Sequence, residues 1–243
     1  MTYTGSKYIE DDFLSIARGH VKDASHIHKF GAVPGMSQNQ TGSVWDVNDT
    51  FYPWTAFDTA GVLTIPAVNA ADNGVIVSVF GLDDNFDLVS ENFTVSSSGT
   101  TTGTETFKRV YRAFVSDGTT NIGNINIQRG GTTVARITVG KGQTLMAIYT
   151  VPNGYTGYLL KGQMSCQAGA DATGNMFVRY SGQSAFRIGH SFEVSGAGGA
   201  YNYDFGVPIQ IPSKSDIDVR ATVRSNNARV SAAFDIILFK GKR

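Results

Sequence analysis

The stretch DIDVRATVR, residues 216–224, alternates apolar and polar side chains at every step. Its aliphatic positions are Ile217, Val219, Ala221 and Val223, and the positions between them carry Asp, Arg and Thr. Successive side chains of a β-strand point to opposite faces, so this pattern predicts a strand with one buried face and one solvated face. A chain organised around such strands falls in the all-β class.

Short segments of a similar kind recur along the chain. LMAIYTV (145–151) and AAFDIILF (232–239) are apolar on both faces, which is typical of central strands that are covered on both sides. Turn residues separate these segments, and the chain holds 28 glycines. About a dozen short strands spaced by turns predict a jelly-roll-like antiparallel β-sandwich.

The start of the chain carries the only clear helical pattern. Ile9, Phe13 and Ile16 recur at helical spacing, and this predicts one short amphipathic helix near residues 8–18. Such a helix has only about three turns and needs a surface to dock on.

The domain organisation follows from where each pattern holds. Residues 19–48 keep neither the helical period nor the strand period for long, so we expect them to form an extended segment. We therefore predict an N-terminal arm over residues 1–50, which contains the helix, and a β-sandwich over residues 51–243. The region near 81–105 also fits a hairpin inserted into that sandwich.

Both tryptophans of the chain lie in VWDVNDTFYPW, residues 44–54. Aromatic side chains bury a large area at a modest cost in entropy. They would pin the exit of the arm to the sandwich, form the centre of a subunit interface, or plug one end of the sandwich. The predicted interface residues, taken from this segment and from the helix, are Ile9, Phe13, Ile16, Trp45, Phe51, Tyr52 and Trp54.

Charge and composition argue against several classes of partner. The chain has 20 basic and 20 acidic residues, and charged residues make up only 16% of it, so no overall field draws in nucleic acid or an anionic membrane. No apolar run approaches the ~18 residues that a membrane-spanning helix needs. The single cysteine, Cys166, cannot form an internal disulfide. We predict neither a nucleic-acid partner nor a membrane partner.

Two segments resemble metal sites in part. His26 and His28 would point to the same side of a strand, as a pair of metal ligands requires, but no acidic or cysteine partner stands at a recognisable spacing. Asp83, Asn85 and Asp87 occupy the first, third and fifth positions of an EF-hand-like loop. The glycine and the glutamate that such a loop needs at its sixth and twelfth positions are missing, which favours an Asx-rich hairpin.

Signatures of enzymes fail along the whole sequence. There is no G-x-S-x-G nucleophile elbow and no complete phosphate-binding loop. We predict no catalytic residue, no cofactor and no metal. YNYDFG places Tyr201, Tyr203 and Phe205 on one strand face, where they would bind a sugar, pack in the core or contact another subunit.

Several segments together resemble structural proteins from the virions of tailed bacteriophages, of the kind found in phages of cyanobacteria and other aquatic bacteria. These segments span nearly the whole chain, and they are FLSIARGHV (13–21), HKFGAVPG (28–35), VWDVNDTFYPW (44–54), GLDDNFDLVSE (81–91), TFKRVYRAFV (106–115), GQTLMAIYTVPNGYTGYLL (142–160) and IPSKSDIDVRATV (211–223). None of them is a catalytic signature. The resemblance assigns no active-site residue.

The resemblance implies a β-rich virion subunit present in many copies and assembled in the host cytoplasm. We expect a non-enzymatic capsid decoration or cement protein, which stabilises the head by multivalent contacts with capsid subunits. Its expected partners are the major capsid protein or other virion proteins, together with further copies of itself in a homo-oligomer, for which a trimer is favoured. The alternatives are a tail, neck or fibre-adaptor protein of the same virion, or a carbohydrate-binding module.

Overall fold

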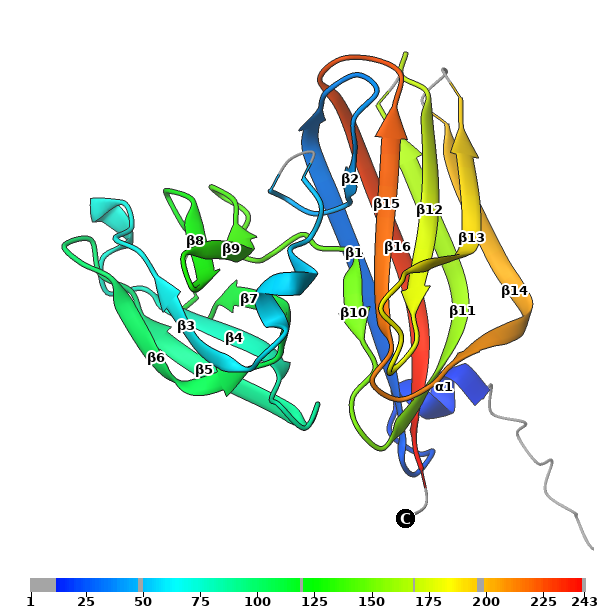
Figure 1. Cartoon of the computed structure of the whole chain (residues 1–243), viewed down its shortest axis with the longest axis horizontal. Coiled ribbons are helices and arrows are strands. Elements are labelled where there is room, and N and C mark those ends of the chain that lie inside the picture. Colours follow the sequence, from blue (N-terminus) through cyan, green and yellow to red (C-terminus); the bar gives the residue numbers. More distant parts are fainter. Residues whose placement is uncertain (1–11, 48–49, 119, 168, 196–198, 242–243) are drawn as a thin grey trace, which may run out of the picture.

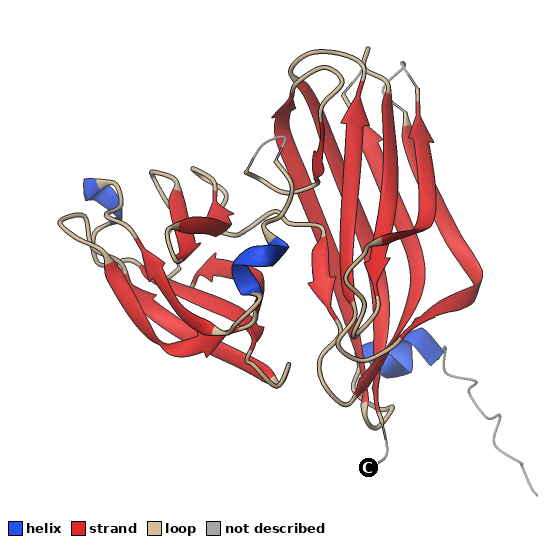
Figure 2. Ribbon diagram, viewed as in Figure 1, coloured by secondary structure: helices blue, strands red, loops and turns tan. Residues whose placement is uncertain are grey.

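The structure, a computed structural model, describes residues 12–47, 50–118, 120–167, 169–195 and 199–241. Figure 1 shows two lobes side by side, and Figure 2 shows that strands make up nearly all of both. Every pair of neighbouring strands is antiparallel. The prediction of an all-β antiparallel protein is confirmed.

The larger lobe is a sandwich of two sheets. The first sheet has the order β1-β16-β11-β14, with β1 at Ala24–Met36, β16 at Ala228–Lys240, β11 at Tyr155–Cys166 and β14 at Ala200–Ile211. The second sheet has the order β10-β15-β12-β13, with β10 at Ile148–Thr150, β15 at Asp216–Val223, β12 at Ala172–Arg179 and β13 at Arg187–Val194. A further short strand, β2 (Thr41–Ser43), also pairs with β15.

Strands β2 and β10 are two halves of one interrupted strand. β2 pairs with residues 220–222 of β15, and β10 pairs with residues 216–218. At the residue between, the Val44 amide donates to the Val219 carbonyl at 2.7 Å, and the Val219 amide donates to the Ala147 carbonyl at 3.2 Å. Counted as one strand, β2 and β10 complete the eight strands and the sheet order of a jelly roll.

The smaller lobe is the segment inserted at that interruption, residues 45–146. One of its sheets has the order β6-β3-β8-β9, with β6 at Thr101–Phe107, β3 at Gly61–Ile65, β8 at Ile125–Arg129 and β9 at Thr132–Ile137. The other has the order β5-β4-β7, with β5 at Leu88–Thr94, β4 at Ile76–Leu82 and β7 at Arg109–Val115. Short 3₁₀ turns lie at Trp54–Phe57 and Ala70–Asp72.

The inserted lobe has its own hydrophobic core, built from buried side chains such as Leu63, Phe93, Phe107 and Ile125. The predicted inserted hairpin near 81–105 is therefore only one part of a complete two-sheet lobe. The predicted boundary at residue 50 is also wrong, because the jelly roll begins before the insertion and resumes after it.

The alternating stretch at residues 216–224 forms β15, and its apolar face is buried as predicted: Ile217, Val219, Ala221 and Val223 are each at most 1% exposed. Its polar face is only partly solvated. Asp216 and Asp218 are also buried, because the inserted lobe lies against this end of the strand.

The predicted N-terminal arm is largely a strand of the jelly roll. Residues 24–36 form β1 and pair with β16 over its whole length. The alternation was hidden because Lys29 and Gly31 hold the inward positions where a strand normally has aliphatic residues. A Cβ on Gly31 would lie 2.2 Å from the Val44 carbonyl oxygen and 2.3 Å from the Ala147 amide nitrogen. Glycine therefore lets β1 pass directly beneath the two chain crossings that lead into and out of the inserted lobe.

The predicted helix is present as α1 (Asp12–Ala17). Positions 8–11 of the expected range, which include Ile9, lie outside the described residues. α1 packs beside β1 on the outer face of the first sheet, near the end of the sandwich where β16 ends (Figure 1).

The interrupted strand predicts that the jelly roll folds without the inserted lobe. Deleting residues 45–147 joins Val44 directly to Ile148 and restores one continuous strand along β15. We expect this variant to be a monodisperse β-protein with a cooperative unfolding transition, measured by circular dichroism and urea denaturation. It will be less stable than the full chain because the covered end of β15 becomes exposed. A product without cooperative unfolding would show that the jelly roll depends on the insertion.

Candidate interaction surface

The two lobes are joined by a buried ion pair. The carboxylate of Asp216 on β15 accepts from Arg109 of β7 in the inserted lobe, at 2.8 Å from Nε and 3.1 Å from Nη2. Arg179 of β12 donates to the same carboxylate at 2.6 and 3.0 Å, and the Thr150 hydroxyl donates at 2.6 Å. One bidentate guanidinium from Arg109, a second guanidinium from Arg179 whose two donors share Oδ2, and a hydroxyl compensate the buried carboxylate well.

The tryptophan segment covers this ion pair. Trp54 donates from Nε1 to Asp218 at 3.0 Å, and Tyr52 donates from its hydroxyl to the Val110 carbonyl at 3.1 Å. The ring of Tyr52 makes edge contacts with Trp45 and Trp54 at centroid distances of 5.2 and 4.7 Å. The predicted pin therefore exists, but it joins the inserted lobe to the jelly roll rather than an arm to a sandwich.

The alternative role of these residues in a subunit interface is wrong for three of them. Trp45, Tyr52 and Trp54 are 1%, 2% and 7% exposed inside the single chain, so no partner reaches them. Phe51 differs, because it is 51% exposed with the Arg220 guanidinium above its ring.

Two ionisable groups at the junction have strongly shifted pKa values. Burial, together with the nearby positive charge of Arg112, lowers the pKa of Lys29 to about 7. Its ammonium donates to the Tyr111 carbonyl of the inserted lobe. Burial raises the pKa of Asp46 to about 7, although a hydrogen bond from Thr138 opposes this shift. The second carboxylate oxygen of Asp46 is buried and has no hydrogen-bond partner within the described residues.

The outer face of the first sheet carries a polar row that crosses all four of its strands. His28 of β1 lies opposite Asp235 of β16, Asp235 lies opposite Lys161 of β11, and Lys161 lies opposite Asp204 of β14. Nδ1 of His28 and Nε2 of His26 lie 2.6 and 3.0 Å from the same oxygen of Asp235. Nζ of Lys161 lies 3.5 Å from its other oxygen.

Burial alone would raise the pKa of Asp235, but the hydrogen bonds and charges of His28 and His26 outweigh it and lower the pKa overall. Asp235 is thus the acidic partner that the sequence did not reveal for the histidine pair. Even so, no group of three or more His, Cys, Asp and Glu side chains is arranged to hold a metal ion in the part of the chain that the structure describes.

A groove of about 780 Å³ lies next to this row, between α1 and β14. Its apolar walls include Phe13 and Leu14 of α1 and Pro208 of β14, and polar residues of the row also line it: His26, Lys161, Asp204 and Asp235. Phe13 is 59% exposed and Leu14 is 50% exposed, whereas Ile16 is only 9% exposed. Ile16 also lines the groove but is already buried within the chain, whereas the interface role of Phe13 stays a prediction.

The groove is shaped by irregular pairing of β11 and β14. Leu159 lies opposite Ile209, but Lys161 lies opposite Asp204, so four residues of β14 face the single residue Leu160. This wide bulge carries Phe205–Pro208 out of the regular sheet. Leu160 and Lys161 both line the groove as a result.

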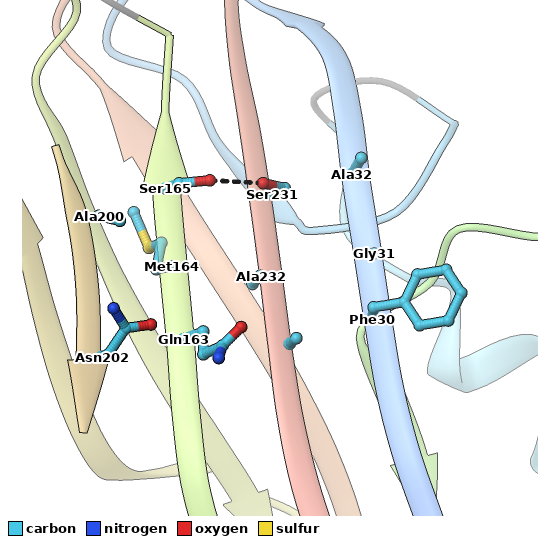
Figure 3. Close-up of a pocket in the computed structure, with 11 residues that line it drawn as sticks. Phe30, Gly31, Ala32, Gln163, Met164, Ser165, Ala200, Asn202, Ser231 and Ala232 are labelled. Atoms are coloured by element: carbon cyan, nitrogen blue, oxygen red, sulfur yellow. Dashed lines mark hydrogen bonds between the residues drawn. The ribbon is translucent and has the colours of Figure 1, made fainter. Parts of the chain in front are cut away.

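A shallower hollow of about 280 Å³ lies on the other side of the polar row (Figure 3). Small and polar side chains form its floor, and Ser165 and Ser231 share a hydrogen bond of 2.7 Å across β11 and β16. Phe30 on β1 marks the rim and is 36% exposed. The outer face of this sheet is thus only partly covered by its own chain.

A second surface is the open edge of the sandwich between β13 and β14. Within the described residues β14 pairs only with β11, and β13 pairs only with β12, so each leaves one backbone edge unpaired. Tyr203, Ile188 and Val207 are 41%, 58% and 84% exposed along this edge. The rings of Tyr201 and Tyr203 are nearly parallel, at a centroid distance of 6.3 Å and an angle of 10°.

His190 of β13 lies against this aromatic group, with its ring centroid 4.7 Å from that of Tyr203 and 5.1 Å from that of Phe205. Burial lowers its pKa. The aromatic strand face that the sequence indicated therefore faces the gap between the two sheets at its open end, where it is partly buried and partly exposed.

The calcium-like loop is a hairpin turn, as the sequence favoured. Oδ1 of Asp83 accepts from the backbone amides of Asn85 and Asp87, each at 2.9 Å, which is an Asx-turn. Phe86, in the turn of this hairpin, contacts the jelly roll: its carbonyl accepts from the Asn153 amide at 2.8 Å, and the ammonium of Lys214 lies 5.7 Å from the centre of its ring. The hairpin is therefore a second contact between the lobes.

Cys166 is a free, buried cysteine whose thiol contacts the Ala170 carbonyl at 2.9 Å. Burial raises the pKa of this thiol, which makes it a structural residue rather than a nucleophile. None of the helices in the described residues has the length and apolar character that a membrane-spanning helix needs.

No protein-family model matches the chain, and neither does any curated protein. Among solved structures, the chain is similar to a protein of naturally occurring empty particles of cowpea mosaic virus, with 10% identity and a TM-score of 0.23 over 75% of this chain and 83% of that one. It is also similar to VP2 in the subviral particle of infectious bursal disease virus, with 10% identity and a TM-score of 0.21 over 89% of this chain and 67% of that one. Similarity this weak carries no functional conclusion, and the jelly roll rests on the strand order alone.

The junction predicts a large cost for removing its central carboxylate. Asp216→Ala leaves the buried Arg109 and the partly buried Arg179 without their shared partner, so we expect the free energy of unfolding to fall by about 3–5 kcal/mol. Asp84→Ala is the matched control: its carboxylate is 70% exposed and lies 3.4 Å from Lys108, so a change within about 0.5 kcal/mol is expected. Urea denaturation measures both, and equal losses would contradict the role of Asp216.

Asp46 predicts a specific dependence of stability on pH. Its carboxyl has an ordinary pKa near 4 in the unfolded chain and a pKa of about 7 in the folded protein. Between those values the unfolded state releases a proton that the folded state keeps, so stability falls as pH rises from about 4 to 7. Asp46→Asn removes the titrating carboxyl and with it this loss of stability. We therefore expect the free energy of unfolding of the variant, relative to that of the natural chain, to increase by on the order of 3 kcal/mol between pH 4 and pH 7. Lys29 is present in both proteins, so its contribution to the pH dependence cancels when the two stabilities are compared. Parallel stability profiles in urea at pH 4.5 and pH 8 would contradict this assignment.

Proposed function

We propose that this chain is a non-enzymatic virion structural protein, and specifically a decoration or cement protein on the head of a tailed bacteriophage. The observation that carries the proposal is the presence of two separate exposed apolar surfaces on one body. These surfaces are the outer face of the first sheet beside α1 and the open edge of the sandwich between β13 and β14.

A cement protein must bind several neighbours at once, so that each local opening of a shell also breaks its contacts. Two surfaces held in a fixed relation meet that requirement better than one surface. The resemblance of the sequence to phage virion proteins supports the same role. So does the jelly-roll order, an architecture that viral capsid proteins share with other families such as lectins.

The open edge is the surface we assign to the major capsid protein. Its two edge strands offer unpaired backbone groups to an added strand of a partner. Val207 on the bulge of β14, at 84% exposed, supplies an apolar side chain next to those groups. A neighbouring capsid segment in extended conformation would gain both backbone hydrogen bonds and apolar contact.

A tail, neck or fibre-adaptor protein of the same virion would use the same surfaces in a smaller number of copies. A carbohydrate-binding module is a second candidate, favoured by the parallel rings of Tyr201 and Tyr203, because flat aromatic surfaces suit the apolar faces of sugars. Tyr203→Ala would then abolish binding to a glycan array, whereas a structural protein would show no binding to lose.

Imaging of intact particles tests the proposal. Labelled protein should cover the head in electron micrographs of the phage that encodes it. Val207→Asp should reduce its occupancy at least about tenfold, because a desolvated carboxylate at the edge costs more than 1.4 kcal/mol. Val139→Asp is the matched control, since Val139 is 52% exposed on the inserted lobe. Label confined to the tail would favour the alternative, and unlabelled particles would reject a virion role.

A further inference from the structure

The outer face of the first sheet has a helix on one half and an open groove on the other. α1 packs beside β1, at one edge of the sheet. The groove opens from α1 toward β14, at the opposite edge and at the same level along the strands. A helix with exposed apolar side chains and a groove with both apolar and charged walls therefore lie next to each other on a single face.

We propose that a second copy of the chain docks on this face through a two-fold axis that runs parallel to the strands, between β16 and β11. Rotation about this axis exchanges β1 with β14. It therefore places α1 of each copy in the groove of the other copy. Such an interface is isologous and closes after two subunits.

The size of the groove fits this occupant. One side of α1 already packs on its own sheet, so only the side chains on its exposed side enter the groove of the other copy. α1 has six residues, and the groove measures about 780 Å³. Phe13 and Leu14 supply the apolar side chains, since both are at least half exposed in the single chain.

The polar row fits the same rotation. From β1 to β14 its groups are an imidazole, a carboxylate, an ammonium and a carboxylate, contributed by His28, Asp235, Lys161 and Asp204. The two-fold rotation places the row of one copy over the row of the other in reverse order. Lys161 of each copy then faces Asp235 of the other, and His28 faces Asp204. Each donor then faces an acceptor, so the face is complementary to its own copy in charge as well as in shape.

The remaining features of the face agree with this pairing. The rotation carries Phe30 at the rim on β1 to the β14 side of the hollow, over Asn202 and Ala200. The phenyl ring of one copy would thus lie over Asn202 and Ala200 of the other, two residues that Figure 3 shows on β14. The pairing makes a second copy the neighbour at this face and leaves the open edge between β13 and β14 to another partner, and it does not depend on the virion role.

Sedimentation of the purified full-length chain tests the pairing. We expect a concentration-dependent dimer of twice the 26.0 kDa chain mass. Leu14→Glu should raise the dissociation constant at least about tenfold, because it replaces an apolar contact with a carboxylate close to Asp204 and Asp235, which line the groove. Ile122→Glu is the matched control: Ile122 is 58% exposed on the inserted lobe, and its replacement should leave the dimer unchanged. A monomer at all concentrations, a trimer, or equal loss in both variants would overturn the proposal.

Disulfide cross-linking tests the geometry itself. Leu14→Cys and Gly206→Cys are made in separate chains, so that a bond between them can form only between two copies. Gly206 tolerates the change, since a Cβ there meets no atom within 4 Å. We expect the mixture to give a cross-linked pair under mild oxidation, while Ile122→Cys mixed with Gly206→Cys gives none. A mixture that cross-links no better than this control would overturn the assignment of α1 to the groove.

Discussion

The whole architecture depends on β15, because two separate segments of the chain pair along the same edge of this strand. β15 holds β2 and β10 in consecutive register, and the inserted lobe leaves and returns at the residue opposite Val219. The ends of the insertion are linked to each other by the hydrogen bond from the Ala147 amide to the Val44 carbonyl, at 2.9 Å. A lobe with adjacent ends can be added without disturbing the sheet, since the strand that it interrupts still pairs along its length.

The contacts at the junction convert this connection into a fixed relation between the lobes. Two short crossings alone would permit a hinge. The Arg109 to Asp216 ion pair, the contact of Phe86 with Asn153 and Lys214, and the hydrogen bond from Lys29 to the Tyr111 carbonyl are three further contacts between the lobes. A hinge motion of the inserted lobe would have to break them. The surfaces of the jelly roll therefore keep their position relative to the inserted lobe.

The sequence predicted the strands better than their grouping. Alternation located β15 and the buried face of the sandwich, because that signal is local. It could not reveal the insertion, since both lobes are built from short strands with similar turns and nothing in the composition changes at Val44. It also missed β1, where Lys29 and Gly31 replace the expected aliphatic residues for reasons that only the other lobe explains.

The candidate surface was harder still to predict, because its groups are distant in sequence. His28 and Asp235 are separated by 207 positions and meet only through the pairing of β1 with β16. The spacing of His26 and His28 did signal a shared side of a strand, which the structure bears out. The partner of that pair needed the sheet order, and local patterns do not carry it.

The aromatic residues of the tryptophan segment follow from the charges that they cover. An ion pair in water contributes about 0–1 kcal/mol, so Arg109 and Asp216 would hold the lobes weakly if solvent reached them. The Arg109 guanidinium lies over the ring of Trp54, at 5.5 Å from its centroid. The indole nitrogen of Trp54 also donates to Asp218. Tyr52 and Trp45 fill the space behind it. With water excluded, separating the lobes would leave buried charges unpaired, and that penalty is several times larger. The largest side chains of the chain are therefore gathered where the inserted lobe begins, because there they make a weak surface interaction into a strong buried one.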